Sequence, residues 1–493
     1  MSPSRVARIF CIIADILVTV LLIGFVEQQT CPARDLLQLL LFLLLWGEIY
    51  LIWSWGHPAE KKTLHLSGVI LLLFSFLLLA TMSEVFLHAR TAYIPRQVMN
   101  ALPSRGEYLR TDVFLFDDAP IQVGHRFHPN QNAPIAGQSR EILTWNRVGR
   151  FLYQPAPDPI QIRFITDENG YRNAAPLAGH YPIVVSGDSF TAGLEVETPW
   201  PDLLAQAVGQ SVLNLASVGY GPQAEVAAVR LYGLDKEPEI IILAYFEGND
   251  LRDAFIYDEA RQQNMSFDQY QASEAPWNRR LVTLTAVRVW AANLARLVSL
   301  RGEPQPERAP VDTTAVYPIE VTINEQEMAL SFLDGYVAML TAQQSDIESS
   351  HNWELVTAAL LESQQMAQEN GARFILLYLP SKPHVYLPLL PAETAEAITS
   401  TAGQAKLENG RIIADTTTAG LPYEQFMAHI NDQALMLADF ARSHNMEFLN
   451  LTPVFQAEAA QGQVLYLSLS THWNPSGHQL AAQTVADYLT AGR

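Results

Sequence analysis

The 493-residue chain has few cysteines and a shortage of positive charge. Its two cysteines, Cys11 and Cys31, exclude a disulfide-rich framework and a cysteine-based zinc cluster. They lie near opposite ends of one apolar segment, about 30 Å apart in a helix rising ~1.5 Å per residue, so no bridge is expected. Lysine and arginine number 31 against 51 aspartates and glutamates, a net charge of −20. This balance excludes a nucleic-acid partner.

The sequence also lacks a metal-binding pattern. His472 and His478 stand six residues apart, separated by proline and glycine, and have no carboxylate or cysteine partner nearby. His125 and His128 are interpreted as structural. We therefore expect neither a metal nor a cofactor.

Long apolar runs are present at the N-terminus. Residues 9–26, 36–55 and 64–86 are each apolar over roughly 18 positions or more, enough for a helix to cross a hydrocarbon core of about 30 Å. Because two further runs follow the first at once and no small-residue cleavage site is evident, the first is interpreted as a retained span and not as a signal peptide. Three transmembrane helices are predicted.

The loops between these runs predict their orientation. Arg5 and Arg8 precede the first run, and Lys61 and Lys62 separate the second from the third, whereas the other loop is poor in positive charge. Positive loops stay in the cytoplasm. The protein is therefore predicted to be a multi-pass protein of the cell membrane with a cytoplasmic N-terminus and an extracytoplasmic remainder.

Two carboxyl groups, Asp15 and Glu48, fall inside the first two predicted spans. Such groups are costly in a bilayer, which suggests proton movement or contact with a partner membrane protein, for example an acyl donor. A hydrogen bond that joins the two helices is the alternative.

Composition divides the chain into three parts. Residues 1–90 form the membrane anchor, and residues 91–180 form a proline-rich extracytoplasmic lead-in with one strand at 160–166. Residues 181–493 form the main domain, interrupted by an insertion at about 254–350. Within the insertion, a basic amphipathic stretch at 279–301 either packs on the core or lies on the lipid surface.

The main domain alternates apolar strands with amphipathic helices. Strands are expected at 183–186, 212–215, 240–245, 374–379 and 447–451, and helices at 200–208, 223–232, 353–370 and 429–444. Continuously apolar strands separated by helices predict an α/β fold whose parallel sheet is covered on both faces. Ligands of such sheets bind at the carboxyl ends of the strands.

Polar groups suited to ester chemistry follow three of these strands. Ser189 comes after the first, Gly219 closes the loop after the second, and Asn249 follows the third. His472 enters from the last loop. A hydroxyl at the end of a buried strand with a histidine in reach is the arrangement that nucleophilic acyl transfer requires.

These blocks resemble the SGNH, or GDSL-type, hydrolases, in particular their membrane-anchored members with an HWN motif. The matching motifs occur in family order: GDSF at 187–190, the glycine of NLASVG at 214–219, GND at 248–250 and HWNPSGH at 472–478. The resemblance implies a flavodoxin-like three-layer α/β/α sandwich with a parallel sheet, the SGNH hydrolase fold. It also implies that Ser189 is the nucleophile and His472 the base, with the N–H groups of Ser189 and Gly219 and the Asn249 amide holding the oxyanion.

One position departs from the family pattern. Relatives carry an aspartate two residues before the histidine, where this chain has Ser470, which can orient an imidazole but supplies no charge. Either Ser189 and His472 work as a dyad oriented by Ser470 or by a backbone carbonyl, or another carboxylate takes part, or the site binds without turnover. Three carboxylates lie near the motifs in the sequence: Asp188, Asp250 and Asp253.

Topology and resemblance together predict the function. We expect an extracytoplasmic serine esterase or O-acyltransferase that acts on acylated cell-envelope glycan, lipid or exported polysaccharide through an acyl-Ser189 intermediate. The alternative is a catalytically silent glycan-binding or polysaccharide-assembly membrane protein.

Overall fold

The structure is a computed structural model that describes residues 82–84, 122–136, 142–145, 151–154, 161–265, 270, 286–287, 316–416, 418–467 and 470–491. The chain divides into two compact units, residues 1–103 with 275–296 and residues 104–274 with 297–493. Apart from residues 82–84, the three predicted spans lie outside the described residues, and so do Asp15, Glu48 and both cysteines. Of the predicted amphipathic stretch at 279–301, only residues 286–287 are described. Among the described residues, none of the helices combines the length and the apolar character needed to cross a membrane.

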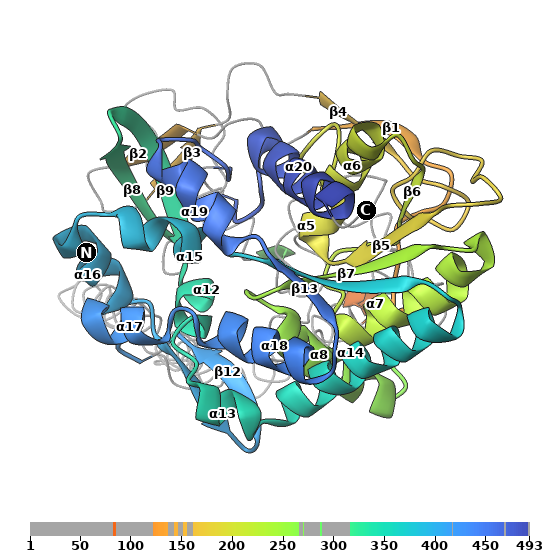
Figure 1. The fold of residues 1–493 in the computed structure, drawn as a ribbon. Coiled ribbons are helices and arrows are strands. Elements are labelled where there is room, and N and C mark those ends of the chain that lie inside the picture. Colours follow the sequence, from red (N-terminus) through yellow and green to blue (C-terminus); the bar gives the residue numbers. More distant parts are fainter. Residues whose placement is uncertain are drawn as a thin grey trace, which may run out of the picture. The chain divides into compact units, whose positions relative to one another are not determined.

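A five-stranded parallel sheet forms the centre of the second unit (Figure 1). Its strands are β5 (Ile183–Gly187), β6 (Val212–Asn214), β7 (Ile240–Phe246), β10 (Arg373–Leu379) and β13 (Glu447–Asn450), in the spatial order β13-β10-β7-β5-β6. From β5 the chain builds the sheet first toward β6 and then, from β7 onward, in the opposite direction. The strand order therefore reverses at β5, the type of position where ligands bind in such sheets.

Helices cover both faces of the sheet, as the sequence predicts (Figure 1). One face packs against α6 (Trp200–Val208), α19 (Thr452–Ala460) and α20 (Pro475–Ala491), and the other against α7 (Pro222–Ala228), α8 (Asp250–Gln262), α14 (His351–Glu369) and α18 (Asp432–Ser443). Alternate strand residues point to opposite layers: Val185 joins the core with Trp200, and Val184 joins the core with Val356. Burial of both faces explains why the strands are apolar throughout.

Two predicted helices differ in detail. The 223–232 helix ends at Ala228 and continues as a π-helical turn, η2 (Val229–Gly233). The 429–444 helix corresponds to α18, which begins at Asp432; of the predicted range, only His429 belongs to the preceding helix, α17 (Tyr423–His429). Between the two helices, the Asn431 side chain accepts a hydrogen bond from the buried His384 at 3.1 Å.

The lead-in contains more strand than the sequence predicts. Antiparallel pairs form between β1 (Asn132–Ala136) and β4 (Gln161–Ile165), the predicted strand, and between β2 (Ile142–Trp145) and β3 (Phe151–Gln154). A turn follows β4, in which Gly170 has φ +82°. A Cβ at Gly170 would lie 2.2 Å from the Phe127 carbonyl oxygen, so the turn requires glycine.

The region after β7 holds an antiparallel hairpin, β8 (Val316–Ile323) and β9 (Gln326–Leu333), whose Leu330 and Phe332 join the α6-side core. The remaining elements are α5 (Ser189–Ala192), η3 (Leu234–Lys236), α12 (Asp334–Met339), α13 (Gln344–Glu348), α15 (Lys382–Tyr386), η4 (Leu387–Leu389), α16 (Ala392–Thr399), β11 (Gln404–Glu408) and β12 (Arg411–Asp415).

Candidate active site

Ser189 is the first residue of α5, directly after β5. Asp188 caps this helix, because its carboxylate accepts the Phe190 N–H at 2.9 Å. The preceding Gly187 is required by the tight strand-to-helix turn, since a Cβ there would lie 2.5 Å from Thr191 Oγ1. The turn leaves the Ser189 side chain at the carboxyl edge of the sheet.

The structure brings His472 to Ser189 from 283 residues away, with 2.8 Å between His472 Nε2 and Ser189 Oγ. His472 lies on a loop closed by the bridge between Tyr466 and Trp473 and by a 3.0 Å hydrogen bond from Leu467 N to the His472 carbonyl. Trp473 is fully buried and packs edge to face on Phe190. The loop is thereby attached to the helix that carries the serine.

Position 470 holds a serine, and the carboxylate that contacts His472 is that of Glu195. The predictions from the sequence did not include Glu195. Glu195 Oε2 lies 2.9 Å from His472 Nδ1 and accepts the Ser470 hydroxyl at 2.8 Å. Since a carboxylate only accepts hydrogen bonds, Nδ1 carries the proton and Nε2 accepts the Ser189 hydroxyl. Serine, imidazole and carboxylate thus stand in the order of a catalytic triad.

Ser470 lies between these groups, as its predicted orienting role requires. Its Oγ is 3.0 Å from His472 Nδ1 and accepts the His472 backbone N–H at 3.2 Å. Its own proton goes to Glu195. Ser470 therefore contacts both the carboxylate and the imidazole, and its role in orienting His472 stays a prediction.

The three carboxylates near the motifs have other contacts. Asp188 caps α5, Asp250 accepts the Phe246 N–H at 2.7 Å, and Asp253 pairs with Arg252 at 2.8 Å. Glu195 instead lies in the short loop after α5, which returns to the same edge of the sheet. Its place in the sequence, in the loop that follows the serine, does not by itself indicate a contact with His472.

Gly219 and Asn249 follow the two strands that flank β5. Gly219 has φ +70° in the loop after β6, and Asn249 caps α8 after β7. The Asn249 amide lowers the pKa values of the Asp188 and Asp253 carboxyls, against the larger effect of burial. The three expected oxyanion donors therefore follow adjacent strands, and their role in holding an oxyanion stays a prediction.

Several carboxyl groups are buried near Asn249. Burial raises the pKa of Asp188 to about 6, although the Phe190 amide and the charge of His472 oppose the shift. Burial and the neighbouring carboxyl groups hold the pKa values of Glu225 and Asp250 well above the usual range.

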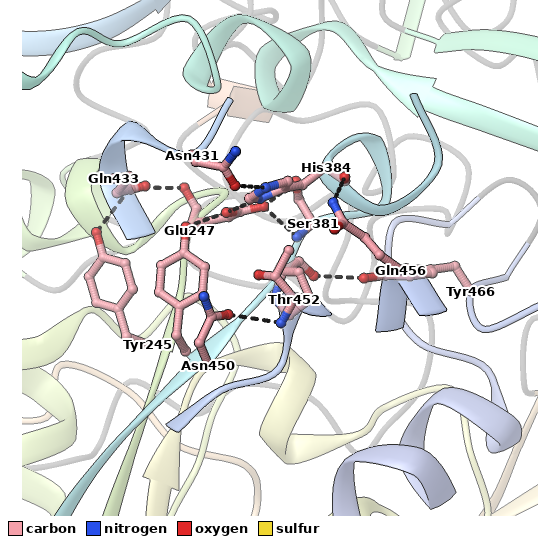
Figure 2. A network of polar contacts seen from close by, with 12 residues as sticks. Tyr245, Glu247, Ser381, His384, Asn431, Gln433, Asn450, Thr452, Gln456 and Tyr466 are labelled. Atoms are coloured by element: carbon pink, nitrogen blue, oxygen red, sulfur yellow. Dashed lines mark hydrogen bonds and ion pairs between the residues drawn. The ribbon is translucent and has the colours of Figure 1, made fainter. Parts of the chain in front are cut away.

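A second buried network surrounds Glu247, which separates β7 from the GND motif (Figure 2). Its carboxylate accepts hydrogen bonds from Tyr378 OH, from Ser381 N and Oγ at 2.6 and 2.7 Å, and from His384 Nδ1 at 2.7 Å. Burial opposes a charged imidazole, but the charge and hydrogen bonding of Glu247 and the Asn431 amide together raise the pKa of His384. Glu247 and His384 are both buried from solvent.

The other histidines make structural contacts. His478 Nδ1 accepts the Trp200 N–H at 3.2 Å, and burial lowers its pKa to about 3. His125 Nε2 donates to the Val218 carbonyl at 2.5 Å, and burial lowers its pKa to about 4. Within the part of the chain that the structure describes, no three His, Cys, Asp or Glu side chains are grouped so that they could hold a metal ion.

No protein-family model and no curated protein matches this chain. It is similar to a solved structure from Desulfitobacterium hafniense, described as a lipolytic protein of the G-D-S-L family, at 14% identity and a TM-score of 0.29, over 62% of this chain and 98% of that one. It is also similar to a GDSL-like lipase from Bacteroides thetaiotaomicron (9% identity, TM-score 0.27, 65% and 93% of the two chains). A carbohydrate esterase family 2 enzyme from Corynascus thermopiles matches at 12% identity and a TM-score of 0.26, over 70% and 82% of the chains. Likenesses of this extent assign no activity to the chain, so its function has to be argued from its own residues.

Proposed function

We propose that the chain is an SGNH-type serine enzyme that transfers acyl groups from esters, with Ser189 as nucleophile, His472 as base and acid, and Glu195 as the orienting carboxylate. One observation carries the proposal. A continuous hydrogen-bonded path runs from Ser189 Oγ through His472 to Glu195, with distances of 2.8 and 2.9 Å. This is the geometry by which a serine hydroxyl is activated.

The reaction follows from that path. Ser189 Oγ forms a bond to the ester carbonyl carbon while its proton moves to His472 Nε2, and the N–H groups of Ser189 and Gly219 and the Asn249 amide receive the oxyanion. The tetrahedral intermediate then breaks its bond to the leaving alcohol, which takes the proton from His472. Glu195 stabilises the imidazolium between the two transfers. An acyl-Ser189 ester remains.

The second half of the reaction decides between hydrolysis and transfer. Water or a sugar hydroxyl attacks the acyl-Ser189 carbonyl, His472 accepts its proton, and Ser189 leaves with that proton returned to Oγ. Water makes the protein an esterase, and a sugar hydroxyl makes it an O-acyltransferase. Both outcomes use the same residues.

Location narrows the substrate class. The three N-terminal apolar runs and the distribution of positive loops support a domain held outside the cytoplasmic membrane. An enzyme held there meets acylated cell-envelope glycans, lipids and exported polysaccharide, and in the transfer case a membrane protein could supply the acyl group. We propose acylated cell-envelope glycan or exported polysaccharide as the substrate. The Glu195 contact removes one of the two features that favour a silent site, the serine at position 470. The other, the carboxyl groups of Asp15 and Glu48 within the predicted spans, remains.

A fluorophosphonate probe on the full chain tests the proposal, because the probe bonds only to an activated serine. We expect labelling of the wild type, loss of labelling in Ser189→Ala, and no change in Ser443→Ala, which alters an exposed serine away from the site. Hydrolysis of a chromogenic acetate ester should follow the same pattern. Labelling that persists in Ser189→Ala, or a wild type that neither labels nor turns over ester, contradicts the proposal. The ester content of envelope glycans in cells carrying Ser189→Ala then tests the substrate class.

A further inference from the structure

Two loops distant in the sequence meet at the candidate site. The acid loop, residues 192–197, begins at the last residue of α5 and carries Glu195. The histidine loop, of which residues 467 and 470–472 are described, carries Ser470 and His472. Their contact joins side chains 277 residues apart. The position of Glu195 against His472 therefore depends on what holds each loop.

A buried arginine from outside the predicted main domain binds the acid loop. Arg172 is 4% exposed, and its Nη1 donates to the carbonyls of Ala192, at 3.3 Å, and Gly193. Its Nη2 donates to the carbonyls of Val196, at 2.6 Å, and Glu197, at 3.0 Å. These carbonyls lie on both sides of Glu195 in the chain. The planar guanidinium thus fixes the backbone before and after the carboxylate.

Arg172 is itself held by the lead-in. It follows the Gly170 turn, in which Asp167 accepts the Tyr171 N–H at 3.0 Å, and its guanidinium lies over the Phe164 ring at 5.0 Å. Burial lowers its pKa to about 10, with Asp202 and Glu197 opposing the shift, so it remains charged at pH 7. A charge this deeply buried is costly, and its partners in hydrogen bonding are main-chain carbonyls of a single loop.

The histidine loop is held independently. Lys382 Nζ donates to the carbonyls of Leu467 at 2.6 Å and Ser470 at 2.5 Å. The neighbouring Ser381 is bound through its backbone and side chain to Glu247 (Figure 2). Because these contacts come from the end of β10 and not from the lead-in, loss of Arg172 should displace Glu195 and leave His472 in place.

We propose that Arg172 is a positioning residue for the reaction: it holds the acid loop so that Glu195 stays in contact with His472 Nδ1. The inference rests on the proposed function and gives the lead-in a role in catalysis. A displacement of about 1 Å in such a site can lower the rate by about 100-fold. Arg172 also bonds the carbonyl of Ala192, the last residue of α5, but the proposal places its effect on the reaction in the position of Glu195. Most of that effect should therefore vanish when Glu195 is replaced by a residue that carries no charge.

A double-mutant cycle on the full chain tests this dependence. We expect Arg172→Met to lower kcat by about 100-fold and to change KM by less than about threefold. In the Glu195→Gln background, the same substitution should lower kcat by less than about threefold. Arg126→Met is the matched control, because Arg126 also lies in the lead-in and donates to a main-chain carbonyl, that of Asn169 at 3.0 Å. We expect it to leave kcat within about threefold of the wild type.

Two outcomes would overturn the proposal. In one, Arg172→Met is as damaging in the Glu195→Gln background as in the wild type. In the other, Arg126→Met has the same effect as Arg172→Met. Circular dichroism verifies folding, and if Arg172→Met does not fold, the cycle is run with Arg172→Lys, which keeps the charge but loses the planar fork and should cost about tenfold.

A spectroscopic readout separates this proposal from the proposed function. If the wild type neither labels nor hydrolyses ester, the proposed function fails, and the low-field proton resonance of His472 Nδ1–H then decides the positioning role. Its assignment comes from its loss in His472→Gln. A resonance present in the wild type and lost in both Glu195→Gln and Arg172→Met supports the proposal. A resonance retained in Arg172→Met overturns it.

Discussion

The carboxyl groups near the site fall into two groups that differ in their surroundings. Asp188, Glu225, Asp250 and Asp253 are buried near Asn249, and burial raises the pKa of each. Glu195 lies at the edge of the sheet, where its side chain keeps 10% of its exposure and meets the His472 imidazole and the Ser470 hydroxyl. Burial favours the neutral form of these four carboxyl groups, although Arg252 opposes it at Asp253 and the charge of His472 opposes it at Asp188. Glu195, in contrast, directly contacts the imidazole that becomes cationic in the proposed reaction.

The difference shows why nearness in sequence to a motif does not select the catalytic acid. A carboxylate that serves a triad must remain charged while the imidazole gains a proton, and burial without a cationic partner works against that charge. Asp188 is adjacent to Ser189, yet its carboxylate is used to cap α5. Glu195 has the orientation and the hydrogen-bond donors that the role requires.

Glu195→Gln should produce the largest change. A glutamine favours the wrong imidazole tautomer and cannot stabilise the imidazolium, so we expect kcat to fall by about 10³- to 10⁴-fold. Turnover of a chromogenic ester measures it. Glu197→Gln is the matched control, because Glu197 lies on the same loop and its carboxylate accepts the Arg163 backbone N–H. An equal loss in both variants would mean that the comparison between the two groups of carboxyls is wrong.

Asp188→Asn should have a smaller effect than Glu195→Gln. It should change the free energy of unfolding by an amount that depends on pH. Below pH 3.8 the Asp188 carboxyl is protonated in both the folded and the unfolded chain. Between pH 3.8 and about 6, the carboxyl loses its proton in the unfolded chain but keeps it in the folded chain. The wild type therefore loses stability as the pH rises through this range. Because the pKa of Asp188 differs by about two pH units between the folded and unfolded chains, the free energy of unfolding falls by about 3 kcal/mol in all. The full loss is reached above pH 6. Asparagine does not titrate and can still cap α5.

Thermal unfolding of both proteins from pH 4 to pH 7 measures this difference. The stability of Asp188→Asn relative to the wild type should increase over that range and level off near pH 7. Parallel curves for the two proteins would show that Asp188 is charged when folded, and the contrast with Glu195 would disappear.

The sheet and the turn that carries Ser189 were predictable because their signals are local. A continuously apolar strand such as β7 carries its burial in its own residues, and Gly187 and Ser189 adopt a turn that depends on their immediate neighbours. The helix at 200–208 was predicted with the bounds that the structure has. In each case the residues that decide the structure are contiguous in the chain.

Glu195 and Arg172 could not be predicted in this way, because their roles depend on contacts between separate loops. Glu195 is one acidic residue among many in an acidic chain until the fold brings it to His472, 277 residues away. Arg172 lies in a lead-in whose strands the sequence shows only in part, and its partners are backbone carbonyls, which have no sequence signature.

Ser470→Asp is the finest test of whether Glu195 is the carboxylate that orients His472. The substitution places the aspartate of the family pattern beside the Glu195 carboxylate. Ser470 Oγ lies 2.8 Å from Glu195 Oε2, so two carboxylates would share this space, and their repulsion should displace one of them or retain a proton on it. We expect kcat to fall by about tenfold, which corresponds to about 1.4 kcal/mol. In the Glu195→Gln background, Ser470→Asp should raise kcat by about 100-fold, because the new carboxylate can then orient His472 alone. Ser470→Asn, which adds no carboxylate, should not raise kcat in that background. A gain in the wild-type background, or no rescue in Glu195→Gln, would show that the Glu195 carboxylate is not the group that orients His472.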